Sequence, residues 1–362
     1  MAEEVLPHAA ECQVVTQFRA DDLKAYAAGL LQAGGYSPDH AKRTSDILVW
    51  ANARGANSHG VLRIPRYIEM VEQGAIDPVA KPELVTQDGA IAVLEAGRAP
   101  GPSAMVTAMD AAIDIADRVN IGWCSARNIT HAGAVGYFAL RAVERGCIGI
   151  VMTASGPLMA YHGAKVSGLS TNPISIAAPS MGRPLLLDMS TSTVALGKIM
   201  HAKDAGTAIP SGWAIDAGGA PATDPNKVAT LTPLGGPKGS GLSLMIEVLS
   251  SVLIANPVIA TVLGGGKGAM NGAALAIKVD AFGAPDQFAN HIADLGQRLK
   301  ALPKAPDTDE ILLPGERGFR LSEVRMREGI PVADGTLARL ASLGERFDVA
   351  PPVEIKTDGA DS

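Results

Sequence analysis

The sequence contains few cysteines, few aromatic residues and no dense cluster of positive charge. Its three cysteines, Cys12, Cys124 and Cys147, form neither a CxxC pair nor a metal-ligand spacing, so we expect no disulfide framework and no metal site. Aromatic residues make up 4% of the 362 residues, which predicts aliphatic cores without large stacking platforms. A net charge of −6 gives no electrostatic footprint for nucleic acid or an anionic membrane, so a small-molecule partner is favoured.

Signals for export and for membrane insertion are also missing. The first residues, MAEEVLPHAAE, contain no basic region followed by an apolar run, which predicts a cytoplasmic protein. The most apolar window covers residues 242–263, but Glu247 and the Asn256-Pro257 pair interrupt it. We therefore predict a buried helix over residues 240–255 and no membrane span.

The chain length predicts about two domains. In the N-terminal third, apolar residues three and four apart predict helices over 18–33, 37–54 and 64–73. Strands and helices alternate from there on, which is typical of an α/β domain. The remaining expected elements are strands at 91–94, 122–125, 147–153, 174–178, 185–187 and 275–280, helices at 101–119, 136–144, 285–302, 322–328 and 334–343, an extended loop at 205–241 that covers a site, and a frayed tail at 351–362.

One polar segment carries side chains suited to acid–base chemistry. His59, Arg63 and Tyr67 are four residues apart, so a continuous helix would direct all three to one face, with Ser58 beside them. An imidazole exchanges protons near neutral pH, a guanidinium fits a carboxylate, and the hydroxyl groups add hydrogen bonds. The alternative is an amphipathic helix with solvated arginines. In either case Pro65 requires the helix to begin or bend near that position.

A second histidine strengthens the hypothesis of a functional site. Thr130 and His131 precede Gly133 and Gly136, where a helix is predicted to begin with free backbone N–H groups that suit an anion or a cofactor amide. Taken alone, His131 is more typical of a structural residue whose hydrogen bonds are satisfied. The functional interpretation rests on the polar and glycine-rich segments that follow.

The common nucleotide-binding fingerprints are absent. No G-x-G-x-x-G follows a strand with an acidic residue about twenty positions later, and no G-x-x-x-x-G-K-[ST] occurs. Two glycine-rich loops, 234–241 and 263–268, each offer backbone amides and one lysine to a phosphate. The first loop leads directly into the predicted apolar helix, so it is the better phosphate candidate.

Seven motifs in a fixed order carry the clearest signal. They are SHGVLRIPRY (58–67), NITHAGAVGY (128–137), STNPISIAAP (170–179), LDMSTSTVALGKI (187–199), IPSGWAIDAGGAPATDP (209–225), GGPKGSGLSLMIEVL (235–249) and PGER (314–317). Over residues 21–320 the sequence resembles the malate/L-lactate dehydrogenase-like NAD(P)-dependent oxidoreductases. That group includes ureidoglycolate, sulfolactate and 2,3-diketogulonate oxidoreductases and reductases of cyclic imino acids such as Δ1-piperideine-2-carboxylate.

The resemblance implies an α/β fold distinct from the Rossmann fold. It implies an α/β cofactor-binding domain over 86–302 and a largely helical substrate-side domain over 1–85, completed by 303–362. It further implies a homodimer whose active site lies between the domains, near the subunit interface. The implied cofactor is NAD(H) or NADP(H), with no preference indicated, and no metal is required.

The site residues are inferred from their positions in the motifs. The match implies His59 as the acid/base residue, but His131 matches a histidine that some members use as the proton acceptor, so this choice stays open. Ser58, Arg63 and Tyr67 would hold the substrate carboxylate and neighbouring oxygens. The residues expected around the cofactor are Ser155, Asn172, Pro173, Asp188, Met189, Ser190, Thr191, Lys198, Lys238, Glu316 and Arg317.

These assignments predict hydride transfer between nicotinamide and C2 of a small 2-oxo or 2-hydroxy acid, with a histidine as proton donor or acceptor. Asp188 could orient a histidine, or could instead cap a helix. The same residues would serve reduction of a cyclic 2-imino acid. A non-catalytic relative that binds a carboxylate or nucleotide is a further alternative, but such a protein would need the arginine and not two imidazoles. His162, Ala132 and Ser240 depart from the family pattern in ways that would change the pocket volume.

Overall fold

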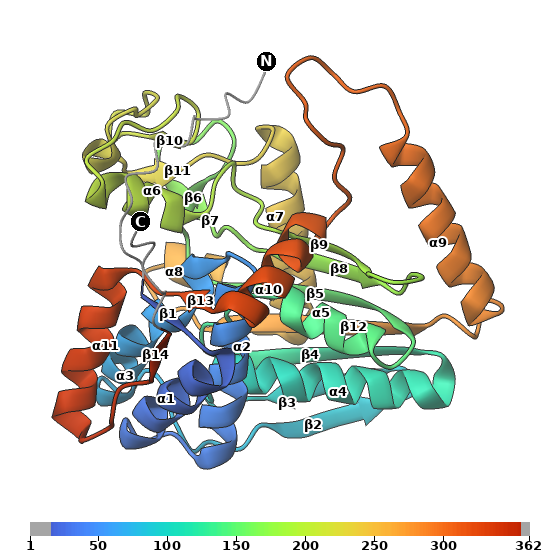
Figure 1. The fold of residues 1–362 in the computed structure, drawn as a ribbon, viewed down its shortest axis with the longest axis horizontal. Coiled ribbons are helices and arrows are strands. Elements are labelled where there is room, and N and C mark those ends of the chain that lie inside the picture. Colours follow the sequence, from blue (N-terminus) through green and yellow to red (C-terminus); the bar gives the residue numbers. More distant parts are fainter. Residues whose placement is uncertain (1–15, 356–362) are drawn as a thin grey trace, which may run out of the picture.

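The computed structural model describes residues 16–355 (Figure 1). Cys12, the N-terminal run MAEEVLPHAAE and residues 356–362 of the tail lie outside the described residues. Within the described part of the chain, no helix combines the length and apolarity needed to cross a bilayer.

Most helices begin and end close to the residues predicted from periodicity. Two begin earlier than expected, α7 (Pro237–Ser250) because a proline fits the first helical turn, and α10 (Glu316–Glu328) directly after Gly315, whose φ is 84°. Helix α7 also ends at Ser250, earlier than residue 255, where the predicted helix ended. The other helices are α1 (Ala20–Ala33), α2 (Pro38–Ala53), α3 (Ile64–Glu72), α4 (Gly101–Val119), α5 (Gly136–Val143), α6 (Leu196–Asp204), α8 (Ile259–Leu263), α9 (Pro285–Lys300) and α11 (Asp334–Phe347), with 3₁₀ turns η1 (Asn57–His59), η2 (Val61–Arg63), η3 (Pro225–Lys227) and η4 (Val252–Ile254).

A seven-stranded sheet occupies the middle of the molecule. In spatial order its strands are β2 (Glu83–Asp88), β3 (Ile91–Glu95), β4 (Ile121–Ile129), β12 (Met270–Lys278), β5 (Cys147–Ala154), β8 (Ile174–Ala178) and β9 (Leu185–Met189). Among the described strand pairs of this sheet, only β3 and β4 run parallel. This arrangement is unlike a doubly wound parallel sheet and explains the missing Rossmann fingerprint. Strand β12 begins well before residue 275, the predicted start, because its small buried residues show no alternation.

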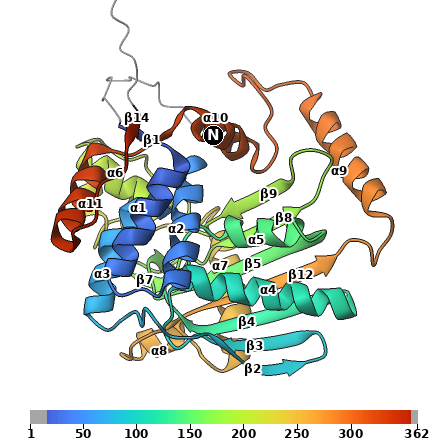
Figure 2. The same cartoon turned by 60° about the horizontal axis from the view of Figure 1, so that its bottom comes forward.

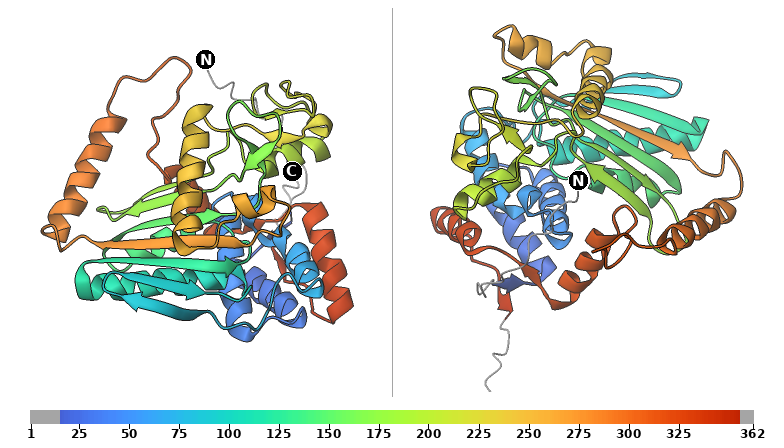
Figure 3. Two further views of the ribbon diagram at one scale, coloured as in Figure 1. Left: turned by 180° about the vertical axis from the view of Figure 1, so that it is seen from behind. Right: turned by 90° about the horizontal axis from the view of Figure 1, so that it is seen from above.

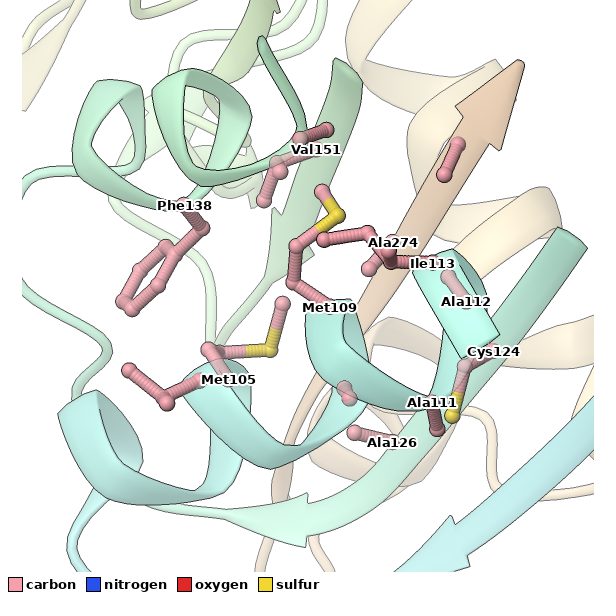
Figure 4. Close-up of a cluster of buried hydrophobic side chains, with 14 of the residues drawn as sticks. Met105, Met109, Ala111, Ala112, Ile113, Cys124, Ala126, Phe138, Val151 and Ala274 are labelled. Atoms are coloured by element: carbon pink, nitrogen blue, oxygen red, sulfur yellow. The ribbon is translucent and has the colours of Figure 1, made fainter. Parts of the chain in front are cut away.

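Helices α4 and α5 cover one face of this sheet (Figure 2). Met105 and Met109 of α4 fill the space between the strands and Phe138 of α5, all fully buried (Figure 4). At Gly122 and Gly149, a side chain would collide with a helix carbonyl, so each helix approaches its strand closely. The predicted aliphatic core is therefore confirmed. Helix α7 packs on the opposite face (Figure 3).

A second layer is helical and is built from both ends of the chain. Helices α1, α2, α3 and α11 surround an apolar core that includes Phe18, Leu30, Leu48 and Leu340. A three-stranded sheet, β13 (Ile330–Pro331), β1 (Gln17–Phe18) and β14 (Glu354–Ile355), closes this layer. The tail is thus ordered at β14, where fraying was predicted, because it pairs with β1.

A small sheet replaces part of the loop predicted over residues 205–241. Its strands are β10 (Ala214–Ile215), β11 (Thr230–Leu231), β6 (Met159–Ala160) and β7 (Ser167–Leu169). The prediction failed here because strands of two or three residues are too short to show a period. Together with α6, this sheet buries a third apolar cluster that includes Met159, Ile199 and Leu231.

Candidate functional site

Two loops bring His59 and His131 together. His59 ends η1, and His131 lies in the loop between β4 and α5. Their ring centroids are 5.6 Å apart and the ring planes are inclined by 16°, so the imidazoles stack. The structure thus joins the two histidines that the sequence singled out separately.

On each imidazole ring, a hydroxyl group lies within hydrogen-bonding distance of Nδ1. The Tyr67 hydroxyl lies 2.7 Å from Nδ1 of His131, and the Ser58 hydroxyl lies 3.0 Å from Nδ1 of His59. Arg63 donates from Nε to the carbonyl of Ser58 over 2.7 Å, and its two outer nitrogens have no protein partner among the described residues. A ligand would therefore meet Nε2 of the imidazoles and the outer edge of the guanidinium.

The predicted single helical face is wrong in detail. Helix α3 begins at Ile64 with Pro65 in its first turn, so His59 and Arg63 lie outside it, in η1 and η2. Gly60 separates the two turns with an extended backbone, φ −90° and ψ −159°. Proline favours the first helical turn and fits poorly further inside, which explains the late helix start. The four side chains meet through this bend.

The surroundings hold both imidazoles neutral at pH 7. Both histidines are only partly exposed to solvent. Burial, followed by the charge of Arg63, lowers the pKa of His59 to about 4. Burial, Arg63 and His59 lower the pKa of His131 well below its ordinary value. Burial also raises the pKa of Tyr67, so its phenol stays protonated.

Asp188 caps α5 in the structure. Its carboxylate accepts the N–H of Gly136 over 3.0 Å, so this amide, predicted to be free for a ligand, is occupied. No hydrogen bond joins Asp188 to either imidazole in residues 16–355. Desolvation by the surrounding protein raises the pKa of Asp188 to about 6, against the effects of the Gly136 N–H and the Arg54 charge, although the residue is exposed to solvent. Its proposed role in orienting a histidine stays a prediction.

Arg54 is a residue near this site that the sequence analysis missed. Its guanidinium lies between the rings of Trp50 and Phe319, 5.0 and 4.0 Å from their centroids, and donates to the carbonyl of Gly315 over 3.2 Å. Burial lowers the pKa of Arg54 to about 10, opposed by the charge of Asp188. Nothing in the sequence distinguishes it from a helix-end arginine, because its partners come from distant segments.

Several expected cofactor residues form one wall beside β9. The N–H of Ser155 donates to Asn172 over 3.4 Å, and the Asn172 amide donates to the carbonyl of Ser243 over 3.0 Å. Thr191 connects two further segments, because its carbonyl accepts the N–H of Leu234 over 2.9 Å. Its hydroxyl is buried without a partner. Loop amides, hydroxyls and one unpaired buried hydroxyl fit a nicotinamide dinucleotide along this wall.

The remaining expected residues divide into two groups. Pro173, Met189 and Ser190 lie in the segments of the same wall, Lys198 lies in the first turn of α6, and Lys238 in the first turn of α7. The second group consists of the two PGER residues, Glu316 and Arg317, at the start of α10.

The structure does not bring Glu316 to the histidines. Its carboxylate pairs with Lys300 at 2.6 Å and with Arg320, and it lines a separate cavity of about 270 Å³ between α9 and the β8–β9 turn. A cofactor role for Glu316 and Arg317 stays a prediction. His162 and Ser240, two of the residues that depart from the family pattern, are in contact. The N–H of His162 donates to the hydroxyl of Ser240 over 2.9 Å.

A metal centre is not evident in the described part of the chain. No three His, Cys, Asp or Glu side chains in residues 16–355 are close enough to hold an ion. The side chains of the site offer proton transfer by imidazole, anion binding by guanidinium and hydrogen bonding by hydroxyl groups.

Comparison with known proteins gives consistent matches over nearly the whole chain. A family profile described as malate/L-lactate dehydrogenase matches residues 18–341. The malate dehydrogenase of Pyrococcus abyssi is 35% identical over 341 residues, covering 91% of this chain and 94% of that protein. The ureidoglycolate dehydrogenase (NAD(+)) of Escherichia coli O157:H7 is 33% identical over 322 residues, covering 86% and 91%.

Solved structures share the fold. The crystal structure of malate dehydrogenase from Entamoeba histolytica superimposes with a TM-score of 0.89 at 28% identity, covering 94% of this chain and all of that one. The Δ1-piperideine-2-carboxylate reductase from Pseudomonas syringae pvar. tomato matches with a TM-score of 0.80 at 26% identity, covering 90% and 99%. The predicted fold, distinct from the Rossmann fold, is confirmed.

Proposed function

The chain belongs to the malate/L-lactate dehydrogenase family, and from this premise we propose that it transfers hydride between a nicotinamide dinucleotide and C2 of a small 2-oxo or 2-hydroxy acid. The observation that carries the proposal is the convergence of two stacked imidazoles, one guanidinium and one phenol beside the wall of expected cofactor residues. A nicotinamide bound there supplies or accepts the hydride.

The residues of this chain then have distinct tasks. The outer nitrogens of Arg63 bind the substrate carboxylate, which orients C2 and reduces the entropic cost of reaching the transition state. One of the two imidazoles exchanges a proton with the oxygen on C2 through Nε2. Tyr67 and Ser58 hold the rings at Nδ1 and so fix which nitrogen faces the substrate.

The test is a spectrophotometric assay at 340 nm with NADH and NADPH in parallel. The panel consists of pyruvate, oxaloacetate, sulfopyruvate, 2,3-diketogulonate and the two cyclic imino acids Δ1-piperideine-2-carboxylate and Δ1-pyrroline-2-carboxylate. We expect turnover of at least one 2-oxo acid, and the same data identify the preferred cofactor. If no member of the panel causes oxidation of NADH or NADPH, the proposal is contradicted.

Reduction of a cyclic 2-imino acid is a second candidate, supported by the similarity to Δ1-piperideine-2-carboxylate reductase. Such a substrate has the same carboxylate for Arg63 and a C=N bond in place of C=O. The two candidates differ in the panel, because a higher kcat/KM for the cyclic imines than for every 2-oxo acid would favour the second.

The position of the site also supports the proposed division into two domains, 86–302 and the helical segments 1–85 and 303–362. His59, Arg63 and Tyr67 come from the helical layer, whereas His131 follows a strand of the large sheet. The site therefore lies where the proposed domains meet.

We further propose that the protein forms a homodimer through the outer face of α7 and η4. Leu244, Met245, Val252 and Leu253 are between 41% and 63% exposed there. Between Lys238 and Lys267 the only charged residue is Glu247, which is buried, so two copies of this face can meet without like charges opposing each other.

Sedimentation analysis tests the dimer. The wild type is expected at about twice the chain mass of 37.2 kDa, and Met245→Lys/Leu253→Asp at the mass of one chain, because buried charges oppose association. Val79→Asp is the control, since Val79 is 60% exposed in another part of the surface and should not change the mass. A monomeric wild type would refute the proposal.

A further inference from the structure

Both histidines of the site lie in loops that regular secondary structure does not hold. His59 stands in a single 3₁₀ turn, and His131 stands between a strand end and a helix start. Loops of this kind need side chains to satisfy their backbone groups and to fix their path. In both loops the side chain that does so is an asparagine.

Asn52, in the last turn of α2, shapes the His59 loop. It is 4% exposed, and its side-chain oxygen Oδ1 accepts a hydrogen bond from the N–H of Val61 over 2.8 Å. Its amide donates to the side chain of Asn57 over 3.2 Å, at the other end of η1. The amide group fills the space beside Gly60, where a side chain on residue 60 would collide with it. Asn52 thus connects the two flanks of His59.

Asn271 of β12 shapes the His131 loop by filling a β-bulge. Between the pairs Met270↔Ile129 and Gly272↔Ala126, strand β4 has one residue more than β12. The displaced N–H of Asn128 donates to the side-chain oxygen of Asn271 over 3.0 Å. A bulge bends its strand and changes the direction of the residues that follow, here the segment that leads to His131.

Further contacts hold this bulge in place. Asn128 has a φ of 56°, uncommon for a residue other than glycine, and its amide donates to Glu95 over 3.0 Å. Asn256, from the turn after η4, donates to the side-chain oxygens of both Asn128 and Asn271 over 3.0 Å. Asn271 donates in return to the carbonyl of Asn256 over 2.8 Å, and its side chain is fully buried. The backbone ahead of His131 is thus fixed by an interlocked set of amides.

We propose that Asn52 and Asn271 are positioning residues, each of which holds one of the two imidazoles at the geometry needed for proton transfer without touching substrate or cofactor. The inference rests on the proposed function for its catalytic meaning, but the positioning itself is a property of the protein alone. Each asparagine acts on one ring, because their hydrogen bonds reach separate loops.

The prediction is therefore a selective effect. Leucine has the same branched arrangement of heavy atoms as asparagine but neither accepts nor donates a hydrogen bond, so Asn271→Leu leaves the N–H of Asn128 unpaired and releases the bulge. Asn52→Leu likewise releases the N–H of Val61. The first variant should disturb His131 and the second His59, and each serves as the control for the other in size, polarity and burial.

Long-range ¹H–¹⁵N spectra of histidine-labelled protein measure this directly. The resonances of the seven histidines are assigned with His59→Gln and His131→Gln. We expect Asn271→Leu to move the Nδ1 and Nε2 resonances of His131, as its bond to Tyr67 weakens, and to move those of His59, whose ring stacks on it, far less. Asn52→Leu should give the opposite pattern. Unchanged spectra, or equal movement of both rings in each variant, would overturn the proposal.

Activity provides the second measurement. In each leucine variant we expect kcat to fall by about 10- to 100-fold, because a misplacement of about 1 Å has effects of that order. The KM for the nicotinamide cofactor should stay unchanged, which general destabilisation would not predict. An increase in KM alone, with kcat unchanged, would contradict a positioning role. If no member of the substrate panel reacts, the proposed function fails while the spectra still decide the positioning.

Milder variants keep the test valid if a leucine variant does not fold. Asn57→Ala removes the partner of the Asn52 amide, and Asn256→Ala removes one donor from the Asn271 group, and both leave the buried asparagine in place. The same selective pattern is expected with smaller shifts. Absence of any selective shift in this pair would also overturn the proposal.

Discussion

Replacement of His131 by glutamine is expected to lower kcat by about 10²- to 10⁴-fold, the usual contribution of a general acid or base. Its Nδ1 faces the buried Tyr67 hydroxyl at 2.7 Å, which leaves Nε2 for the substrate. Glutamine can still hydrogen-bond to the phenol but cannot exchange a proton near neutral pH. His59→Gln is the matched variant, and a larger loss there than in His131→Gln would transfer the acid/base role to His59.

The pH dependence gives an independent check on this assignment. Both imidazoles have lowered pKa values, so they are neutral at pH 7 and ready to accept a proton during oxidation of a 2-hydroxy acid. Oxidation should therefore be nearly independent of pH around neutrality and fall in acid as the imidazole becomes protonated, through about pH 4 if His59 is the base. Reduction needs the protonated ring and should slow as pH rises. The variant that removes the catalytic imidazole should lose this dependence.

Replacement of Arg63 by alanine is expected to lower kcat/KM for the acid substrate by about 10²- to 10³-fold, chiefly through KM. A charged, bidentate hydrogen bond to a carboxylate contributes about 3 kcal/mol or more in an enclosed site. Arg63→Lys should recover only part of this loss, because lysine keeps the charge but lacks the planar fork and the bond from Nε to Ser58.

The same variant should also change the histidines. The positive charge of Arg63 lowers the pKa of both His59 and His131, so its removal should raise both values. Arg66→Ala is the control, since Arg66 lies three residues further on, in α3, and pairs with Glu69 at the surface. A substrate KM unchanged in Arg63→Ala would refute the role of Arg63 in carboxylate binding.

The sequence predicted long periodic elements well and short or irregular ones poorly. Helix α4 matches its predicted bounds, because nineteen residues contain several turns of apolar spacing. Strands β10 and β11 contain two residues each and carry no readable period. The shared helical face considered for His59 and Tyr67 failed because a spacing of four residues does not show that the helix is continuous, and α3 begins only at Ile64, as the helix predicted over 64–73 indicated.

The candidate site was predictable only in part, for a different reason. His59, Arg63 and His131 stand out because their side-chain chemistry is typical of a site that binds a small organic acid and because they lie in recognisable motifs. Asn52 and Asn271 look like ordinary polar residues within a helix and a strand. What distinguishes them is which distant backbone groups they meet, and a single sequence does not state tertiary contacts.

The three-stranded sheet that joins both ends of the chain has a consequence for biosynthesis. Phe18 in β1 pairs with Ile330 and Glu354, and Tyr26 donates to the carbonyl of Leu340 over 2.8 Å. On the ribosome, the first three helices emerge long before these partners have been translated. Their apolar faces stay exposed, or are covered by a chaperone, until residues 330–355 have been translated, so this layer is expected to fold last.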